Sequence, residues 1–357
     1  MRKKYLKEFI IKSILIMFTS ISVITTIGIV VSLFSESIPF FHGERVKQLI
    51  SYGTTWNPRG GQYYILPLMV GTIMIVVFSC LFAIPLGLGS AIYLSEYASP
   101  KVRNILKPVL EILAGIPSVV YGFFALFYIT PFLRKNIGWL MKLILIFSVI
   151  LFLWLGIRTV IKALEKDSVR KKISMMITGV FFIGIFIFLA VNFKKFYLGT
   201  GSLKVDTFNV LSASFAVGII ITPLVASISE DALKAVPITM REASLGLGAT
   251  KFETIWNVTV PAAISGIVSS FILAISRAIG ETMIVTMAAG ARPILNFNPL
   301  GQVQTMTGYM VNKSFGDVVV GSLEYQTIFV VGLILFFITL FLNVIAKKIV
   351  NKYREVY

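Results

Sequence analysis

The chain has 357 residues, a formal net charge of +17 and a hydrophobic content of 57%. This apolar content is too high for a soluble domain, and the apolar runs reach the roughly 20 residues needed to cross a bilayer, so we predict a polytopic membrane protein. The single cysteine and the single histidine exclude a disulfide within the chain and a histidine-cluster metal site.

The N-terminal part of the sequence predicts three membrane spans. Basic residues precede the first apolar run, residues 9–34, and place the N-terminus in the cytoplasm by the positive-inside rule. This run is too long for the hydrophobic part of a cleaved signal peptide. An external segment then leads to a second span over residues 64–94. A basic loop follows, and a third span is expected over residues 109–133.

Prolines interrupt the second and third predicted spans. Pro85 is expected to kink the second span unless neighbouring groups compensate for its missing N–H. In the third span, Pro117 frees backbone carbonyls, and such breaks are tolerated where they line protein or water. Ser118 is therefore a candidate for lining a pathway. A purely structural kink explains the same pattern, and both interpretations stay open.

Two further apolar runs flank the most basic loop of the chain, and we interpret this region as an inserted transmembrane hairpin. Three more spans are expected after it, over residues 209–228, 262–289 and 325–346. The resulting topology has about eight spans with both termini in the cytoplasm, and it places most Lys and Arg residues inside. It divides the chain into an N-terminal span with its external loop, a first core part, the hairpin and a second core part, over residues 1–63, 64–134, 135–208 and 209–357.

A polar stretch bounded by Pro237 and Pro261 separates the fourth and fifth predicted spans. We expect a short helix from Ile238 to Leu245, with Thr239 as its N-cap. Pro261 is expected in the first turn of the next span, where its missing N–H does no harm.

Two glycines divide this polar stretch into two halves. Gly246 and Gly248 allow a tight turn, because glycine tolerates a positive φ. A second short helix is expected from Ala249 to Asn257. Two short amphipathic helices at a membrane surface are suited to docking into a groove on a soluble partner.

Two charged residues stand inside the fifth predicted span. Arg277 and Glu281 are four residues apart and are expected to share one helix face with Ser270, Ala274 and Ala288. An Arg in mid-membrane costs from about 3 to more than 10 kcal/mol and usually faces a polar interior. Either the two charges neutralise each other and hold the helices together, or Arg277 attracts an oxyanion that crosses the membrane while Glu281 competes for the guanidinium.

The polar stretch also has a motif with a defined spacing. The matching residues are Glu242, Ala243, Ser244, Gly248, Val258, Val260 and Pro261. They resemble the EAA loop of ABC-importer permeases, with Ser244 in place of the second Ala and the two valines in place of Ile and Leu. The resemblance implies that Glu242, Ala243, Gly248 and Pro261 form the contact with an ATPase subunit.

Several other stretches match one group of these permeases in combination. They read SESIPFF, TWNP with ILPLMVGT, IPLGLGSAIYLSEYAS, EILAGIPSVVYGFFALF and SRAIGETMIVTMAAG. Together they resemble the permeases of phosphate-specific ABC importers, and the PstC type more than the PstA type, over most of residues 10–133 and 209–347. The resemblance implies an all-α, type I ABC-importer (MetI-like) core of six spans in the cell membrane, to which the hairpin is an addition.

The same resemblance implies roles and partners. It implicates Arg277 and Glu281 in phosphate passage, with Ser118 and Thr282 as further candidate pathway residues. The expected partners are a PstA-like second permease, two PstB-like ATPase subunits and an extracytoplasmic PstS-like phosphate-binding protein. No P-loop motif occurs in the chain, so we expect no cofactor in it and ATP on the ATPase partner.

Three other functions compete with phosphate import. An ABC permease for sulfate, molybdate or phosphonate differs only in the oxyanion, which a single Arg does not discriminate. A secondary transporter would need more buried acids or broken helices in repeated halves. A membrane-bound enzyme is disfavoured, because one His, one Cys and no clustered carboxylates leave little for a catalytic site.

Overall fold

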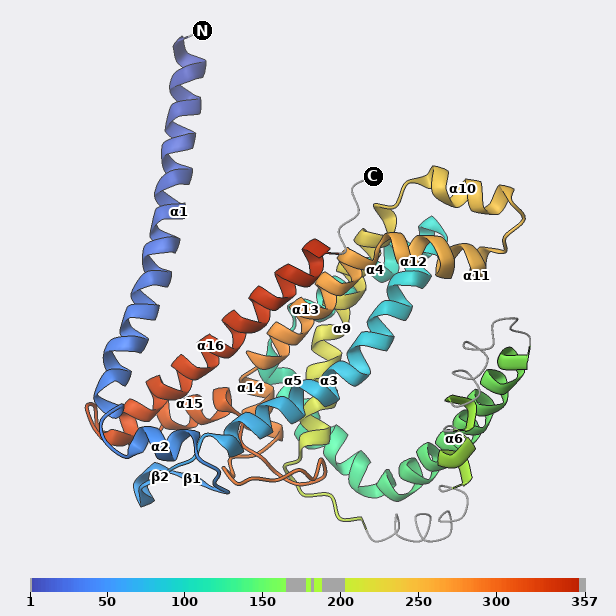
Figure 1. Cartoon of the computed structure of the whole chain (residues 1–357). Helices are drawn as coiled ribbons and strands as arrows, with labels where there is room; N and C mark the ends of the chain where they lie inside the picture. Colours follow the sequence, from blue (N-terminus) through green and yellow to red (C-terminus); the bar gives the residue numbers. More distant parts are fainter. Residues whose placement is uncertain (1, 165–177, 181–182, 188–202, 353–357) are drawn as a thin grey trace. The chain divides into compact units, whose positions relative to one another are not determined.

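The computed structural model describes residues 2–164, 178–180, 183–187 and 203–352, and most of these residues are helical (Figure 1). The main helices are α1 (Arg2–Ser37), α2 (Arg45–Ile50), α3 (Leu66–Ile92), α4 (Pro100–Gly115), α5 (Ser118–Phe124), α6 (Thr130–Leu164), α9 (Val210–Lys234), α10 (Ile238–Gly246), α11 (Lys251–Thr254), α12 (Val260–Ala262), α13 (Ile264–Ile279), α14 (Met283–Ala288), α15 (Met306–Ser314) and α16 (Leu323–Lys352). Short 3₁₀ and π turns connect some of them: η1 (Ile38–Phe40), η2 (Pro58–Gly60), η3 (Tyr93–Tyr97), η4 (Ala125–Ile129) and η6 (Ile255–Thr259). Two short strands, β1 (Trp56–Asn57) and β2 (Gln62–Tyr63), pair antiparallel.

The chain forms two compact units. The first comprises residues 1–126 and 208–357, and the second comprises residues 127–207. The second unit covers most of the predicted hairpin. Within it, α6 approaches a later segment closely, because a Cβ at Gly156 would lie 2.7 Å from Ile183 Cγ1. Most of the hairpin's expected second arm lies outside the described residues, so the hairpin stays a prediction.

Among the described residues, five helical segments are long and apolar enough to cross a membrane, and a bent pair gives a sixth. The third of them runs over Ser118–Thr159 and so continues past residue 133, where we expected the third span to end. The bent pair joins Lys251–Ala262 to Ile264–Ile279 at 71°. The expectation of one unbroken fifth span over residues 262–289 is therefore wrong, because the chain turns at Ala263 and breaks again after Ile279.

Close packing of α3 against α9 forms the centre of the first unit. A Cβ at Gly87 would lie 2.6 Å from Val225 Cβ, so only a glycine permits this approach. α3 continues as a helix through Pro85, and α9 continues in the same way through Pro223. Helix α13 packs on α9, α3 and α16, which places the fifth span beside the central pair.

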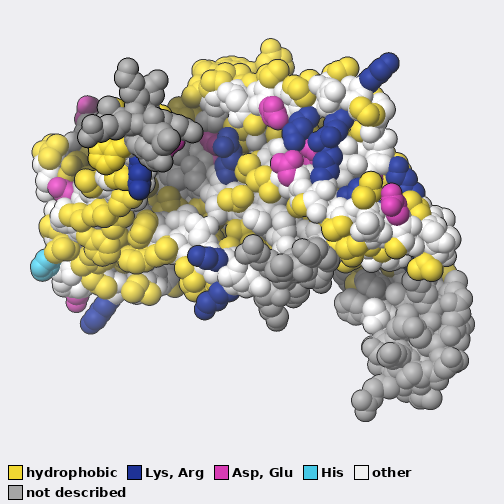
Figure 2. Space-filling model, turned by 90° about the horizontal axis from the view of Figure 1, so that it is seen from above, with side chains coloured by type: hydrophobic (Ala, Val, Ile, Leu, Met, Phe, Trp, Pro, Cys, Tyr) yellow, Lys and Arg dark blue, Asp and Glu magenta, His cyan; other side chains and the backbone are white. Residues whose placement is uncertain are grey.

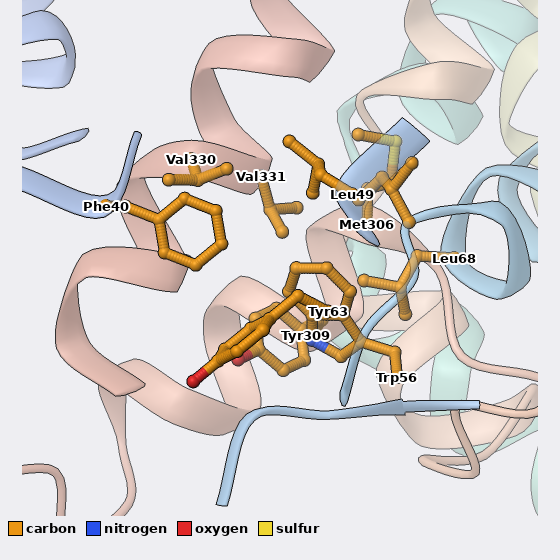
Figure 3. Packing of buried hydrophobic residues seen from close by; sticks show 10 residues of the cluster. Phe40, Leu49, Trp56, Tyr63, Leu68, Met306, Tyr309, Val330 and Val331 are labelled. Carbon is orange, nitrogen blue, oxygen red and sulfur yellow. The ribbon is translucent and has the colours of Figure 1, made fainter. Parts of the chain in front are cut away.

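A cluster of buried aromatic and aliphatic side chains fills the end of the first unit that lies opposite α10 (Figures 1 and 3). The ring of Trp56 is 1% exposed and packs edge-on against Tyr63 and Tyr309, at centroid distances of 6.5 and 5.5 Å. Phe40 and Val331 complete the contact between the segment after α1 and helix α16. Residues 35–63, the external segment predicted before the second span, are therefore held by a hydrophobic core.

Helix α1 is the least covered of the long helices. None of the apolar window in its Glu8–Phe40 segment is buried, and its contacts with the rest of the first unit are made with α16 and η1. In Figure 1 it begins on the side of the unit where α10 lies, and α16 ends on that side as well.

Candidate coupling loop and translocation site

The polar stretch between the two prolines forms two helical pieces at one end of the first unit (Figure 1). Helix α10 begins directly after Pro237, which has φ −54° and ψ 136° and makes no side-chain cap. The expected N-cap, Thr239, lies inside the helix instead. The cap position therefore falls at Pro237, two residues before the predicted one, where the extended ψ of the proline keeps it outside the helix.

A tight turn follows α10, and only one of the two glycines needs its conformational freedom there. Gly248 has φ +87°, whereas Gly246 is the last residue of the helix. The N–H of Gly248 donates to Leu245 O at 2.9 Å, and the N–H of Ala249 donates to Ser244 O at 3.2 Å. The turn predicted from the glycine pair is confirmed, with the positive φ at the second glycine.

Thr250 caps the second piece through a reciprocal capping box. Its side chain accepts the N–H of Glu253, and Glu253 Oε2 accepts the N–H of Thr250 at 2.8 Å. We missed this cap, although the Thr-x-x-Glu spacing in the sequence is its signature. The expected second helix over residues 249–257 begins two residues later, at Lys251.

The second piece does not stop before the next span but runs through the π turn η6 into α12. Pro261 is the second residue of α12 and lies three residues before α13 begins at Ile264. The expected place of Pro261 in the first turn of the span is therefore wrong. The sharp bend falls at Ala263, between the two parts of the bent span.

The surface of this loop combines polar motif residues with large exposed apolar side chains. Glu242, Ala243 and Gly248 are all exposed. Leu247 beside them is 91% exposed. The other large apolar side chains exposed on the loop are Ile238, Leu245, Phe252 and Trp256. A surface with this composition is suited to burial against another protein.

Ser244, the departure from the EAA motif, joins the two helical pieces. Its hydroxyl lies 3.0 Å from Thr254 Oγ1, and the Thr254 side chain is 5% exposed. An alanine at this position has no group that could make this hydrogen bond. The substitution therefore adds a polar contact across the turn.

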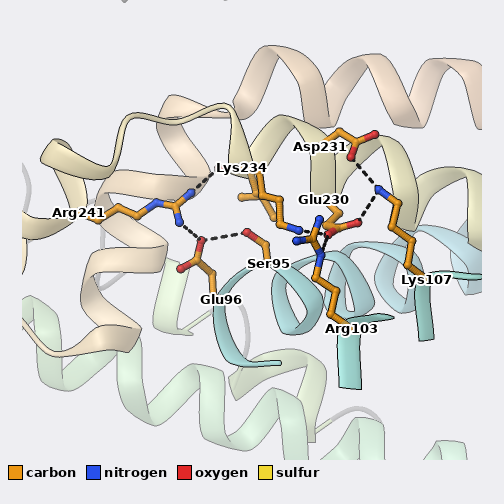
Figure 4. A network of polar contacts seen from close by, with 9 residues as sticks. Ser95, Glu96, Arg103, Lys107, Glu230, Asp231, Lys234 and Arg241 are labelled. Atoms are coloured by element: carbon orange, nitrogen blue, oxygen red, sulfur yellow. Dashed lines mark hydrogen bonds and ion pairs between the residues drawn. The ribbon is translucent and has the colours of Figure 1, made fainter. Parts of the chain in front are cut away.

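A network of ion pairs attaches the loop to the membrane helices (Figure 4). Arg241 of α10 lies 3.2 Å from Glu96 Oε1 in η3 and also donates to Leu233 O in α9. The sequence offered no signal for these contacts, because their partners lie far away in the chain.

Beside this pair, a fully buried carboxylate is surrounded by cations from two helices (Figure 4). Glu230 is 0% exposed and contacts Arg103 at 2.8 Å, Lys107 at 3.3 Å and Lys234 one turn later in α9. Lys107 also bonds Asp231, and this hydrogen bond is the main reason why the pKa of Lys107 is raised above its usual value. Figure 2, which views this end of the molecule, shows Lys and Arg side chains gathered beside Asp and Glu side chains.

The two charged residues of the fifth span are separated by the break after Ile279. Glu281 is 9% exposed, and its Oε1 accepts the N–H groups of Thr282 and Ile284 at 3.1 and 3.4 Å, at the start of α14. Arg277 is exposed on α13 and makes no hydrogen bond or ion pair with a described residue. The expectation that the two share one face of a continuous helix is wrong.

The small and polar residues that we expected on the same face lie in different surroundings. Ser270 and Ala274 are fully buried, and Ser270 Oγ lies 2.7 Å from Ser229 Oγ of α9. Ala288 is also buried, in α14. The expected single polar stripe is therefore not formed. Its small residues are buried in contacts within the subunit, and only Arg277 is exposed.

The other two candidate pathway residues lie at the ends of neighbouring helices. Ser118 is the first residue of α5, directly after the break at Pro117, and it is half-buried. Thr282 precedes α14 and donates its hydroxyl to Gly280 O at 3.0 Å. The two helices pack closely, since a Cβ at Gly122 would lie 2.9 Å from Met287 Sδ. Packing thus brings two interrupted spans together.

Comparisons with known proteins agree with this architecture. Residues 167–355 match the family of binding-protein-dependent transport system inner membrane components. Among curated proteins, the chain is 28% identical over 303 residues to the probable ABC transporter permease protein YqgH of Bacillus subtilis, covering 84% of this chain and 76% of that protein. It is 28% identical over 305 residues to the phosphate transport system permease protein PstC of Xylella fastidiosa, covering 83% of this chain and 76% of that one.

Among solved structures, an inward-facing form of the MetNI methionine ABC transporter matches with a TM-score of 0.50 at 15% identity, covering 84% of this chain and all of that one. This likeness concerns the fold alone. The chain belongs to the family of binding-protein-dependent transport system inner membrane components. It is a multi-pass membrane permease of the ABC type, a transport subunit rather than an enzyme at the level of the family. Membership implies an ATPase partner and a binding protein. Among the described residues, no cluster of three His, Cys, Asp or Glu could hold a metal ion.

Proposed function

We propose that the chain is a PstC-like permease subunit that forms the translocation pathway of an ATP-driven importer of inorganic phosphate. The PstC relatives support phosphate as the substrate. Within the chain, the observation that carries the proposal is the exposed guanidinium of Arg277 in a membrane-spanning segment.

An exposed Arg in a span requires a polar surrounding outside the subunit. Contact with lipid would cost from about 3 to more than 10 kcal/mol, so the guanidinium must face water, a second subunit or a substrate. Its planar array of donors fits a tetrahedral oxyanion. The carboxylate of Glu281 accepts backbone N–H groups instead, so it leaves the positive charge of Arg277 available to an anion.

The exposed apolar surfaces support the proposed partners. The uncovered α1 suits packing against a PstA-like second permease. The loop around Glu242, Ala243, Gly248 and Pro261, with the exposed Leu247, suits docking of a PstB-like ATPase, of which the importer would contain two copies. A PstS-like binding protein would deliver phosphate at the opposite end of the subunit. ATP would be bound by the ATPase, and no cofactor is assigned to this chain.

The test is uptake by the assembled importer in proteoliposomes. Radiolabelled phosphate should accumulate in an ATP-dependent manner when the binding protein is present. Excess unlabelled phosphate should compete, whereas sulfate, molybdate and a phosphonate should not. Accumulation of labelled sulfate or molybdate at a comparable rate would contradict phosphate specificity and would favour the other oxyanions.

A further inference from the structure

One side chain at the base of the proposed coupling loop, residues 237–261, joins three elements that are distant in sequence. Arg241 belongs to α10 and precedes the exposed motif residue Glu242. One of its terminal nitrogens lies 3.2 Å from Glu96 Oε1, in the π turn that follows α3. The other donates to Leu233 O in the last turn of α9 at 2.6 Å. A planar guanidinium can serve two acceptors at once, which an ammonium does less well.

The surroundings of this contact distinguish it from an ordinary surface ion pair. The side chain of Arg241 is 20% exposed and that of Glu96 is 8% exposed. Ser95 donates its hydroxyl to Glu96 Oε1 at 3.1 Å and so helps to orient the carboxylate. Exposed ion pairs contribute little because water screens them, but a largely covered and oriented pair is screened much less.

Neighbouring contacts hold the same helix ends together. Glu230 joins α9 to α4 through Arg103 and Lys107 (Figure 4). Met240 of α10 packs against a buried cluster that includes Ala91 of α3 and Val236 after α9. The ends of α3, α4 and α9 therefore form one connected platform beneath α10.

Two helices of this platform, α3 and α9, also contact α13, the helix that carries Arg277. α3 and α9 pack against each other, and α13 packs on both of them. A force applied to α10 can reach α13 through these two helices, provided that α10 does not slip on its base. The covered ion pair lies at this base, between α10 and the ends of α3 and α9.

We propose that Arg241 is a positioning residue that fixes α10 to the ends of α3 and α9, so that displacement of α10 by an ATPase moves these two spans with it. The proposal rests on the ATPase-docking role of α10 proposed above. It predicts that loss of the ion pair uncouples ATP hydrolysis from transport without removing the ATPase.

The experiment uses the complete importer in proteoliposomes and measures three quantities: ATPase co-purification, ATP hydrolysis and phosphate uptake. The variants are Arg241→Gln, Glu96→Gln and the double variant. Glu96→Gln is decisive, because it changes no residue of α10 and so removes no contact that α10 makes with the ATPase. The matched controls are Lys101→Gln and Glu111→Gln, two exposed residues of α4 that form no ion pair with a described residue.

Both single variants should keep the ATPase bound and should lower the phosphate transported per ATP by about 3- to 30-fold. The double variant should be no worse than Arg241→Gln, since both changes remove one interaction. The reversed pair Glu96→Arg with Arg241→Glu should recover part of the coupling lost in Glu96→Arg alone. The controls should behave as the parent.

Two results would overturn the inference while leaving the proposed function intact. One is an unchanged transport-to-hydrolysis ratio in Glu96→Gln and Arg241→Gln. The other is a double variant in which the two losses multiply, which would show that the residues act separately. A parent complex that binds no ATPase or transports no phosphate would instead contradict the proposed function.

Discussion

Arg277 and Glu281 are four residues apart in the chain but form no ion pair, because α13 ends between them at Ile279. The Glu281 carboxylate accepts two N–H groups at the start of α14, while the Arg277 guanidinium is exposed on α13. The two charges therefore have separate surroundings. This separation leads to different expectations for their variants.

Replacement of Arg277 should impair transport without preventing assembly. Arg277→Ala would remove the proposed charge-assisted hydrogen bonds to the anion, and we expect phosphate uptake to fall by about 10- to 100-fold. Arg277→Lys should also fail to restore full uptake, because a point charge does not reproduce the planar fork. Uptake by reconstituted complexes, normalised to the ATPase that co-purifies, measures both effects. Unchanged uptake in both variants would make Arg277 a structural residue.

Replacement of Glu281 should mainly affect the start of α14. Glu281→Gln keeps an oxygen that can accept the N–H groups of Thr282 and Ile284, so stability and uptake should stay close to those of the parent. Glu281→Ala loses these bonds and should cost about 0.5–2 kcal/mol, measured as a lower thermal unfolding temperature in detergent. If the Gln variant unfolds like the parent but does not transport, the negative charge itself takes part in translocation.

The two glycines of the proposed coupling loop should respond in opposite ways to alanine. Gly248→Ala places a side chain at φ +87° and should cost about 1–2 kcal/mol of local stability, although open space surrounds the new Cβ. Gly246→Ala is the matched control, since this glycine is helical and a Cβ added to it would meet nothing within 4 Å, so alanine should be neutral or stabilising. Hydrogen exchange of the amides in α10 and α11 measures the local stability of both variants. Equal exchange in the two variants would contradict this difference.

Restoring the motif alanine should loosen the loop. Ser244→Ala removes the hydrogen bond to Thr254 and should cost about 0.5–1.5 kcal/mol of local stability. Thr254→Val removes the same bond from the other side, so the double variant should cost less than the sum of the two single changes. Faster hydrogen exchange of the α10 amides in Ser244→Ala would confirm the loss of local stability. Additive single effects would show that the two hydroxyls act independently.

The buried carboxylate of the platform should matter more than its exposed neighbour. Glu230→Gln leaves three cations around an uncharged side chain, and we expect a loss of about 1–3 kcal/mol, because the cations remain partly solvated. Asp231→Asn is the matched control, because Asp231 is 63% exposed and should cost less than about 0.5 kcal/mol. Thermal unfolding of the purified chain compares them. Similar losses in both variants would contradict the importance of burial.

Local patterns in the sequence were sufficient for much of the coupling loop. The spacing of Glu242, Gly248 and Pro261 predicted a loop of the EAA type, and the glycine pair predicted the turn. Both signals come from residues that are close together in the chain. The capping box at Thr250 was also readable from its spacing, although we missed it. Thr239 was wrong as the N-cap, because α10 begins directly after Pro237. The place of Pro261 was wrong, because the π turn η6 continues into α12 and has no signature in the hydrophobic pattern.

The amino-acid sequence was enough to identify a mainly helical membrane permease of the ABC type, because apolar run length and motif spacing are local properties of the chain. How the charged residues are used became visible only in the folded chain. Arg241 meets Glu96, and Glu230 meets Arg103, across large separations in the chain. The break after Ile279, which separates Glu281 from Arg277, also escaped the periodicity of the span. The partners of a charged residue, its burial and the helix ends within an apolar run depend on which helices pack together. The spacing of residues along one helix does not contain this information.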